Sequence, residues 1–129
     1  KQVVSVPLED GNVEIKVVLE SQTGTFTGSV TSDSNLDAQR RASVQATIEA
    51  IYTSLTRRVQ FEISQVSVRN MGEDESKFVV VLLKTDYFIK PVGESMELFG
   101  ASHITSSELE AAVRATLNAT NRTISLLLK

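Results

Sequence analysis

A seven-residue stretch with helical character occurs twice in this chain, and it constrains the fold more than any other feature. Residues 44–50 read VQATIEA and residues 113–119 read VRATLNA, so four positions are identical and a fifth exchanges isoleucine for leucine. A glycine, Gly28 or Gly100, stands in strand-like sequence ahead of each copy. We therefore predict an internal duplication, in which two related units bury their apolar faces together.

The first unit is predicted to hold three strands followed by a helix. Apolar residues alternate with polar ones in three segments, which predicts β-strands over 2–8, 13–20 and 25–31. The last two strands are separated by a short turn containing glycine, so they are expected to form a hairpin. Ser34 and Asp37 have capping-box spacing, which predicts a helix beginning there and ending near Thr56.

The second unit repeats this order. Alternation predicts strands over 59–68 and 96–101, with a β-bulge near 64–65 where the phase of the first one slips. Residues 78–83 are apolar at every position, which is typical of a central strand with both faces covered. Ser107 and Glu110 then form a capping box at the start of a second amphipathic helix.

The predicted fold class is α+β, with two βββα units related by internal pseudo-symmetry and a sheet backed by two helices on one face. We expect a single domain of 129 residues, with unit one over 1–57 and unit two over 58–129. The sequence begins with Lys1 and not with methionine, so we expect a domain excised from, or appended to, a longer chain.

Composition excludes several classes of function. The net charge is -3, which disfavours a nucleic-acid partner because such a surface needs a surplus of Lys and Arg. With no cysteine and with His103 as the one histidine, no typical zinc site is expected, and we predict no cofactor. No apolar run is long enough to span a membrane and no signal peptide is visible, so we expect a soluble cytoplasmic domain.

The end of the sequence resembles a known family. The stretch Gly100-Ala-Ser102, followed by the helix from Glu110 to Arg122, resembles the end of the C-terminal regulatory domain of 2-isopropylmalate synthase and of citramalate synthase. Positions that match the family's helix are Glu110, Ala111, Ala115, Leu117, Asn118, Ala119, Asn121 and Arg122. The resemblance implies two βββα units around a pseudo-twofold axis, with loops that line a pocket for leucine or isoleucine.

The chain departs from that family ahead of its first helix. Where the family has a glycine-rich stretch, this sequence has Asp33, Ser34 and Asn35, so the identity of the effector does not carry over. We therefore predict a non-catalytic, allosteric regulatory or assembly domain. Free N–H groups at the helix N-termini would hold a small carboxylate effector or a partner domain. The expected ligand-binding residues are Asp33, Asn35, Asp37, Ser102, His103 and Ser107.

A sheet covered on one side leaves apolar residues such as Val18 and Val79 in need of a partner. We therefore expect a homodimer through the sheet, or contact with another domain of the same protein. Two alternatives remain open: a structural protein with no small-molecule ligand, and a small acid-base enzyme that uses Asp37, Glu110 or His103. The loop over 86–95 is interpreted as a long hairpin whose aromatic residues pack on the sheet. The alternative interpretation is a ligand lid or a contact with a partner.

Overall fold

The chain folds in the order strand, strand, strand, helix, and then repeats it. The computed structural model describes residues 2–7, 11–21, 24–54, 61–71, 76–85, 96–105 and 107–127. The elements are β1 (Gln2–Pro7), β2 (Val13–Ser21), β3 (Gly24–Ser32), α1 (Leu36–Ser54), β4 (Phe61–Met71), β5 (Ser76–Thr85), β6 (Met96–His103) and α2 (Glu108–Leu127). This confirms the α+β class and the predicted order of elements.

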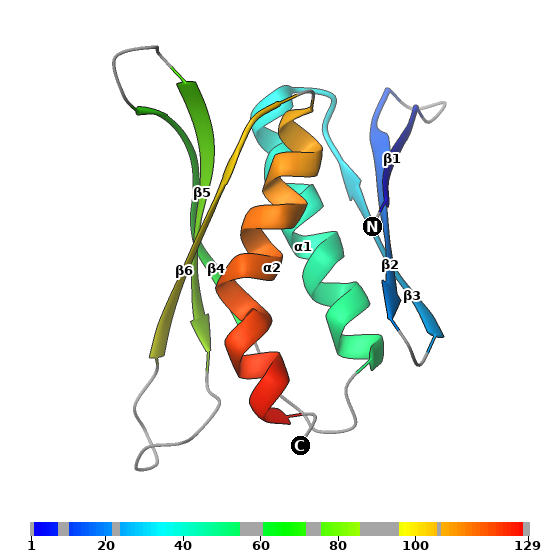
Figure 1. Ribbon diagram of the computed structural model, residues 1–129. Helices are drawn as coiled ribbons and strands as arrows, with labels where there is room; N and C mark the ends of the chain where they lie inside the picture. The colour runs from blue at the N-terminus through cyan, green and yellow to red at the C-terminus, as the bar shows by residue number, and fades with distance from the viewer. Residues whose placement is uncertain are drawn as a thin grey trace.

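Each group of three strands forms its own antiparallel sheet, and the two helices lie between the sheets (Figure 1). Sheet one has the strand order β1-β2-β3 and sheet two the order β4-β5-β6. Helix α1 packs mainly on β2 and β3, and α2 mainly on β5 and β6. The expectation of one sheet with helices on one face is therefore wrong, since the helix pair is covered by a sheet on each side.

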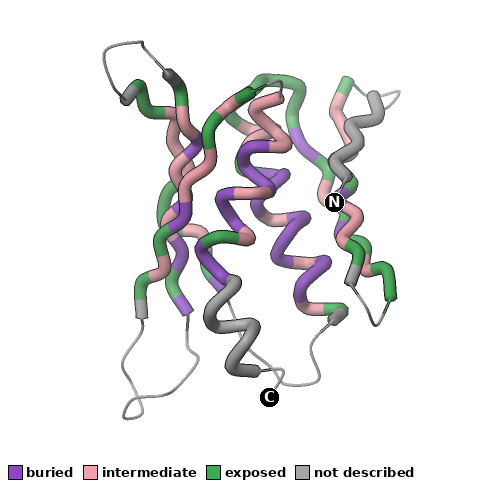
Figure 2. Tube along the Cα trace, in the orientation of Figure 1, coloured by how far each residue is buried: buried purple, intermediate pink, exposed green. Residues whose placement is uncertain are grey.

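Both helices are buried on more than one face, which explains this layering. Buried residues occupy adjacent positions in α1, over 42–44, 46–48 and 50–51, and in α2, over 111–113, 115–116 and 119–120, so they face several directions; Figure 2 shows these buried stretches along both helices. Many of the buried residues are Ala, Ser or Thr, whose small side chains let the neighbouring layers approach. The hydroxyl groups stay satisfied inside the core, because Thr47 Oγ1 and Thr116 Oγ1 each donate to a carbonyl one turn earlier at 2.7 Å.

Two glycines fix how closely each helix approaches its own sheet. A Cβ at Gly28 would lie 2.6 Å from the Ala50 nitrogen, and a Cβ at Gly100 would lie 2.6 Å from the Ala119 nitrogen. The same Cβ atoms would collide with the carbonyl oxygens of Ala46 and Ala115. Since these alanines occupy matching positions of the repeated helical stretch, the two strand-helix contacts have the same register.

The apolar core runs across the helix layer into both sheets. Its larger part joins Val44 and Ile48 of α1 to the buried face of β5 and to the alanines of α2, and its smaller part joins Ile15 and Val17 of β2 to both helices. Neither described helix is long and apolar enough to cross a membrane.

Details of strand pairing confirm several sequence predictions. β2 and β3 form the predicted hairpin, and the register of β4 shifts between Ile63 and Gln65, where the bulge is expected. β6 runs to His103, two residues beyond the predicted strand, because its pairing with β5 continues to Phe78. The predicted end of the first helix at Thr56 lies outside the described residues.

Candidate functional site

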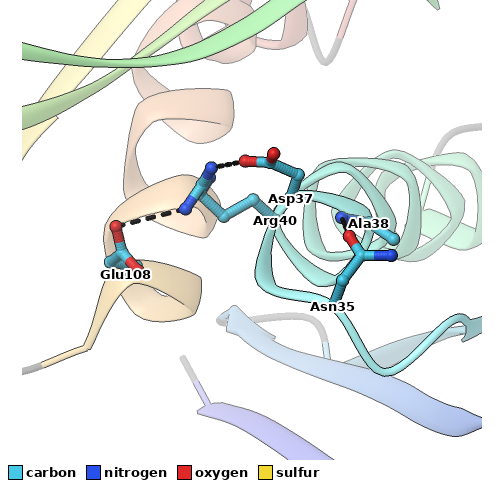
Figure 3. A network of polar contacts seen from close by, with 5 residues as sticks. All are labelled: Asn35, Asp37, Ala38, Arg40 and Glu108. Atoms are coloured by element: carbon cyan, nitrogen blue, oxygen red, sulfur yellow. Dashed lines mark hydrogen bonds and ion pairs between the residues drawn. The ribbon is translucent and has the colours of Figure 1, made fainter.

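The first turns of α1 and α2 lie close together, and an ion pair joins them (Figure 3). Arg40 Nη1 lies 3.2 Å from Glu108 Oε1, and Arg40 Nη2 pairs with Asp37. The Arg40 side chain is 14% exposed, against 26% for Glu108 and 86% for Asp37. Arg40 is therefore a largely buried cation between two helix N-termini, and two carboxylates neutralise it.

Side-chain caps occupy free N–H groups at both helix starts. Asn35 Oδ1 accepts a hydrogen bond from the Ala38 N–H at 2.8 Å, so Asn35 caps α1 in place of the expected Ser34. Ser107 Oγ accepts one from the Glu110 N–H at 3.3 Å, as the sequence predicts. Two predicted ligand-binding residues, Asn35 and Ser107, thus use their side-chain oxygens within the fold.

The remaining predicted ligand-binding residues are dispersed. Asp33 is exposed and lines an open groove between β3 and α1 that also contains Arg41. Ser102 is half-buried on the helix side of sheet two. His103 is exposed on the opposite side of that sheet, where its ring lies 5.0 Å from the ring of Phe78. The structure therefore separates His103 from the helix N-termini by the thickness of the sheet.

The three residues of the acid-base alternative have different surroundings. Asp37 pairs with Arg40, Glu110 Oε1 lies 2.5 Å from Arg114 Nη2, and His103 is on the far side of sheet two. In the part of the chain that the structure describes, no group of three or more His, Asp or Glu side chains is placed to hold a metal ion.

The outer face of sheet two, which is the face turned away from the helices, carries a site that the sequence did not identify. Val79, Val81 and Leu83 of β5 are fully buried against the helices, so the expectation that Val79 needs a further partner is wrong. Val80 and Leu82 alternate with them and point outward, where they are half-buried. The apolar run over 78–83 predicts a strand covered on both faces, but in the described residues the inner face is fully buried and the outer face only partly.

Cross-strand register arranges the outward residues of sheet two in four rows. Each row runs from β4 through β5 to β6, and the rows are Arg69–Phe78–His103, Ser67–Val80–Ala101, Gln65–Leu82–Phe99 and Glu62–Lys84–Glu97. On β5 and β6 the middle rows and Phe78 form an apolar patch whose most exposed member, Phe99, is 64% exposed, and Ser67 and Gln65 of β4 border it. The row with Arg69 is basic and the opposite end row carries net negative charge.

The outer face of sheet one differs in character on strands β2 and β3. Its residues on the central strand β2 are Glu14, Lys16, Val18 and Glu20, and those on β3 are Thr25, Thr27, Ser29 and Thr31. Val18 is the one apolar side chain in this set and is half-buried. The central strands of the two sheets therefore differ, since β5 presents apolar residues outward and β2 presents mainly charged ones.

Neither the comparison with protein-family models nor that with curated proteins gives a match for this chain. The aromatic loop over 86–95 lies outside the described residues.

Proposed function

We propose that this domain is a non-catalytic assembly module that forms a homodimer through the outer face of sheet two. The observation that carries the proposal is the contrast between two sheets with the same strand order. The central strand of sheet two presents Val80 and Leu82 outward, whereas the equivalent strand of sheet one presents mainly charged residues. Contiguous exposed apolar surface on a folded domain commonly marks a contact site.

The two-unit architecture supports this role. We infer that the units descend from one duplicated βββα element, because Gly28 and Gly100 make the same close contacts with matching alanines. Their inner faces and helices pack against each other, so the outer faces are the surfaces left to serve different partners. The resemblance of the last helix to a regulatory domain built from two βββα units fits the same reading.

A pair of matched substitutions tests the proposal. Val80 and Val18 are both half-buried, outward-facing valines on the central strand of a three-stranded sheet. We expect the native chain to sediment as a dimer, Val80→Lys to sediment as a monomer with an unchanged circular dichroism spectrum, and Val18→Lys to remain dimeric. A native chain that stays monomeric, or equal dissociation in both variants, would refute the proposed function.

The regulatory part of the hypothesis, a small carboxylate effector at the helix N-termini, stays a prediction. Asn35 and Ser107 already cap their helices, and Asp37 and Glu108 already pair with Arg40. An effector carboxylate would have to replace one of these groups at Arg40. Thermal stabilisation of the native chain, but not of Arg40→Met, by amino or 2-keto acids would support it, and no stabilisation by any of them would remove it.

A further inference from the structure

We infer that the two copies in this dimer dock face to face with their strands antiparallel, about a twofold axis that runs across the strands of sheet two. This inference rests on the proposed function and specifies its partner surface. Two identical sheet faces can meet about a twofold axis in two simple ways, with the axis along the strands or across them. In aligned packing of two sheets, the strand directions of the two sheets differ by about 30° or less, so both arrangements keep the strands of the two copies nearly parallel or antiparallel.

An axis across the strands sets each strand over its own copy and exchanges the order of the rows. Arg69 then faces the partner's Glu62, and His103 faces the partner's Glu97. At the central strand, Phe78 faces the ammonium group and stem of the partner's Lys84, a favourable cation-π pairing. The basic end of each copy thus lies against the acidic end of the other.

The same operation also matches large side chains with small ones. The row that contains Leu82 and Phe99 lies over the row that contains Val80 and Ala101 in the partner. Phe99, the most exposed large apolar residue in the described part of sheet two, is therefore placed over the partner's Ala101. Interdigitation of bulky and small residues is what gives packed sheet faces their complementarity.

An axis along the strands gives a poor match. Each row then faces its own copy, so Lys84 meets the partner's Lys84 and Glu62 meets the partner's Glu97. Like charges directly opposed across an interface are repulsive. In addition, Leu82 meets the partner's Leu82 while the smaller residues of the neighbouring row face each other across a gap. Charge and shape therefore both select the axis across the strands.

Reversal of single charges gives a direct test, because Arg69 and Glu62 cannot pair within one chain. They lie at opposite ends of β4, about 20 Å apart at the rise of an extended strand. In a dimer of Arg69→Glu, two glutamates face each other at both symmetry-related contacts, and in a dimer of Glu62→Arg, two arginines do. Each variant alone is expected to associate about tenfold more weakly than the native chain.

A mixture of the two variants restores both contacts, since Glu at 69 then meets Arg at 62 and the native Arg69 meets the native Glu62. We expect the equimolar mixture to form heterodimers with near-native affinity, measured by sedimentation velocity with one variant fluorescently labelled. Destabilisation within a single chain is not repaired by mixing, so recovery identifies a contact between chains.

Three results would overturn the antiparallel arrangement. The first is a mixture that associates no better than its components. The second is a Glu62→Arg variant that associates at least as strongly as the native chain, which is the result for an axis along the strands. The third is a native chain that is monomeric. The first two results leave the proposed function intact if the Val80→Lys substitution still abolishes the dimer. The third result refutes both the antiparallel arrangement and the proposed function.

Discussion

Replacement of either strand glycine by alanine tests the close strand-helix contact on which both units depend. In Gly28→Ala the new Cβ would lie 2.6 Å from the Ala50 nitrogen and 3.0 Å from the Ala46 carbonyl carbon, and it would overlap the carbonyl oxygen. Ordinary contacts of this kind are about 3.5 Å or longer, so α1 would have to move off β3 by about 1.5 Å. All three obstacles are backbone atoms, which cannot rotate away as a side chain can.

The expected loss of stability follows from this geometry. Overpacking of a close-packed core costs about 1–3 kcal/mol, and a clash with backbone belongs at the upper end of that range. Alanine also restricts the unfolded chain, which offsets about 0.5–1 kcal/mol. We therefore expect a net loss of about 2–3 kcal/mol in the free energy of unfolding, or a fall of about 10 °C in Tm for a domain of this size.

Urea unfolding followed by circular dichroism measures this loss. Gly100→Ala should cost the same within about 0.5 kcal/mol, because its Cβ meets Ala115 and Ala119 as the Cβ at 28 meets their counterparts. Gly11→Ala is the control: its φ of 86° is strained for alanine, but no atom lies within 4 Å of the added Cβ. A Gly28→Ala chain no less stable than Gly11→Ala, or a tolerated Gly100→Ala, would contradict the equivalence of the two units.

Three further substitutions test local contacts by urea unfolding. Asn35→Ala should lower the free energy of unfolding by about 1 kcal/mol, because it removes the cap of α1, whereas Ser34→Ala should change it by less than about 0.5 kcal/mol. A larger loss for Ser34→Ala than for Asn35→Ala would show that Ser34 is the cap. The Phe61 N–H, the first of β4, donates to Tyr52 Oη at 2.8 Å, so Tyr52→Phe removes its acceptor and should lower the free energy of unfolding by about 1–2 kcal/mol. An unchanged stability would contradict this contribution. Arg40→Ala should lower the free energy of unfolding by about 1–2 kcal/mol, because it removes the ion pair between the two helices. A double-mutant cycle with Glu108→Ala should give a coupling energy of about 1 kcal/mol, and a coupling of zero would contradict this ion pair.

Much of the fold follows from local sequence pattern. The alternation in β2 and β3, the bulge at Ile63 and the cap at Ser107 each leave a signal within a few residues. The division into two sheets leaves no such signal, because it depends on how the two units pack together. The helices do carry one indication of it, because small residues at neighbouring positions, such as Ala42 and Ser43, indicate a helix that is buried on several sides.

The candidate site was harder to predict for a chemical reason. Residue types that bind a carboxylate at a helix N-terminus are the same types that cap the helix, so Asn35 and Ser107 fit both roles in sequence. The apolar strand over 78–83 posed a second ambiguity. Its pattern indicates that both faces are buried, but it does not distinguish a covering layer of the same chain from a second copy.

Disulfide trapping tests the central claim most directly, because the chain has no native cysteine. Glu62→Cys and Arg69→Cys chains, mixed under mild oxidation, should give a cross-linked heterodimer that joins position 62 of one chain to position 69 of the other. Neither chain alone should cross-link efficiently, since the antiparallel arrangement places identical positions at opposite ends of the interface. Efficient homodimeric cross-links, or equal trapping in a mixture that carries Val80→Lys, would contradict the proposed assembly.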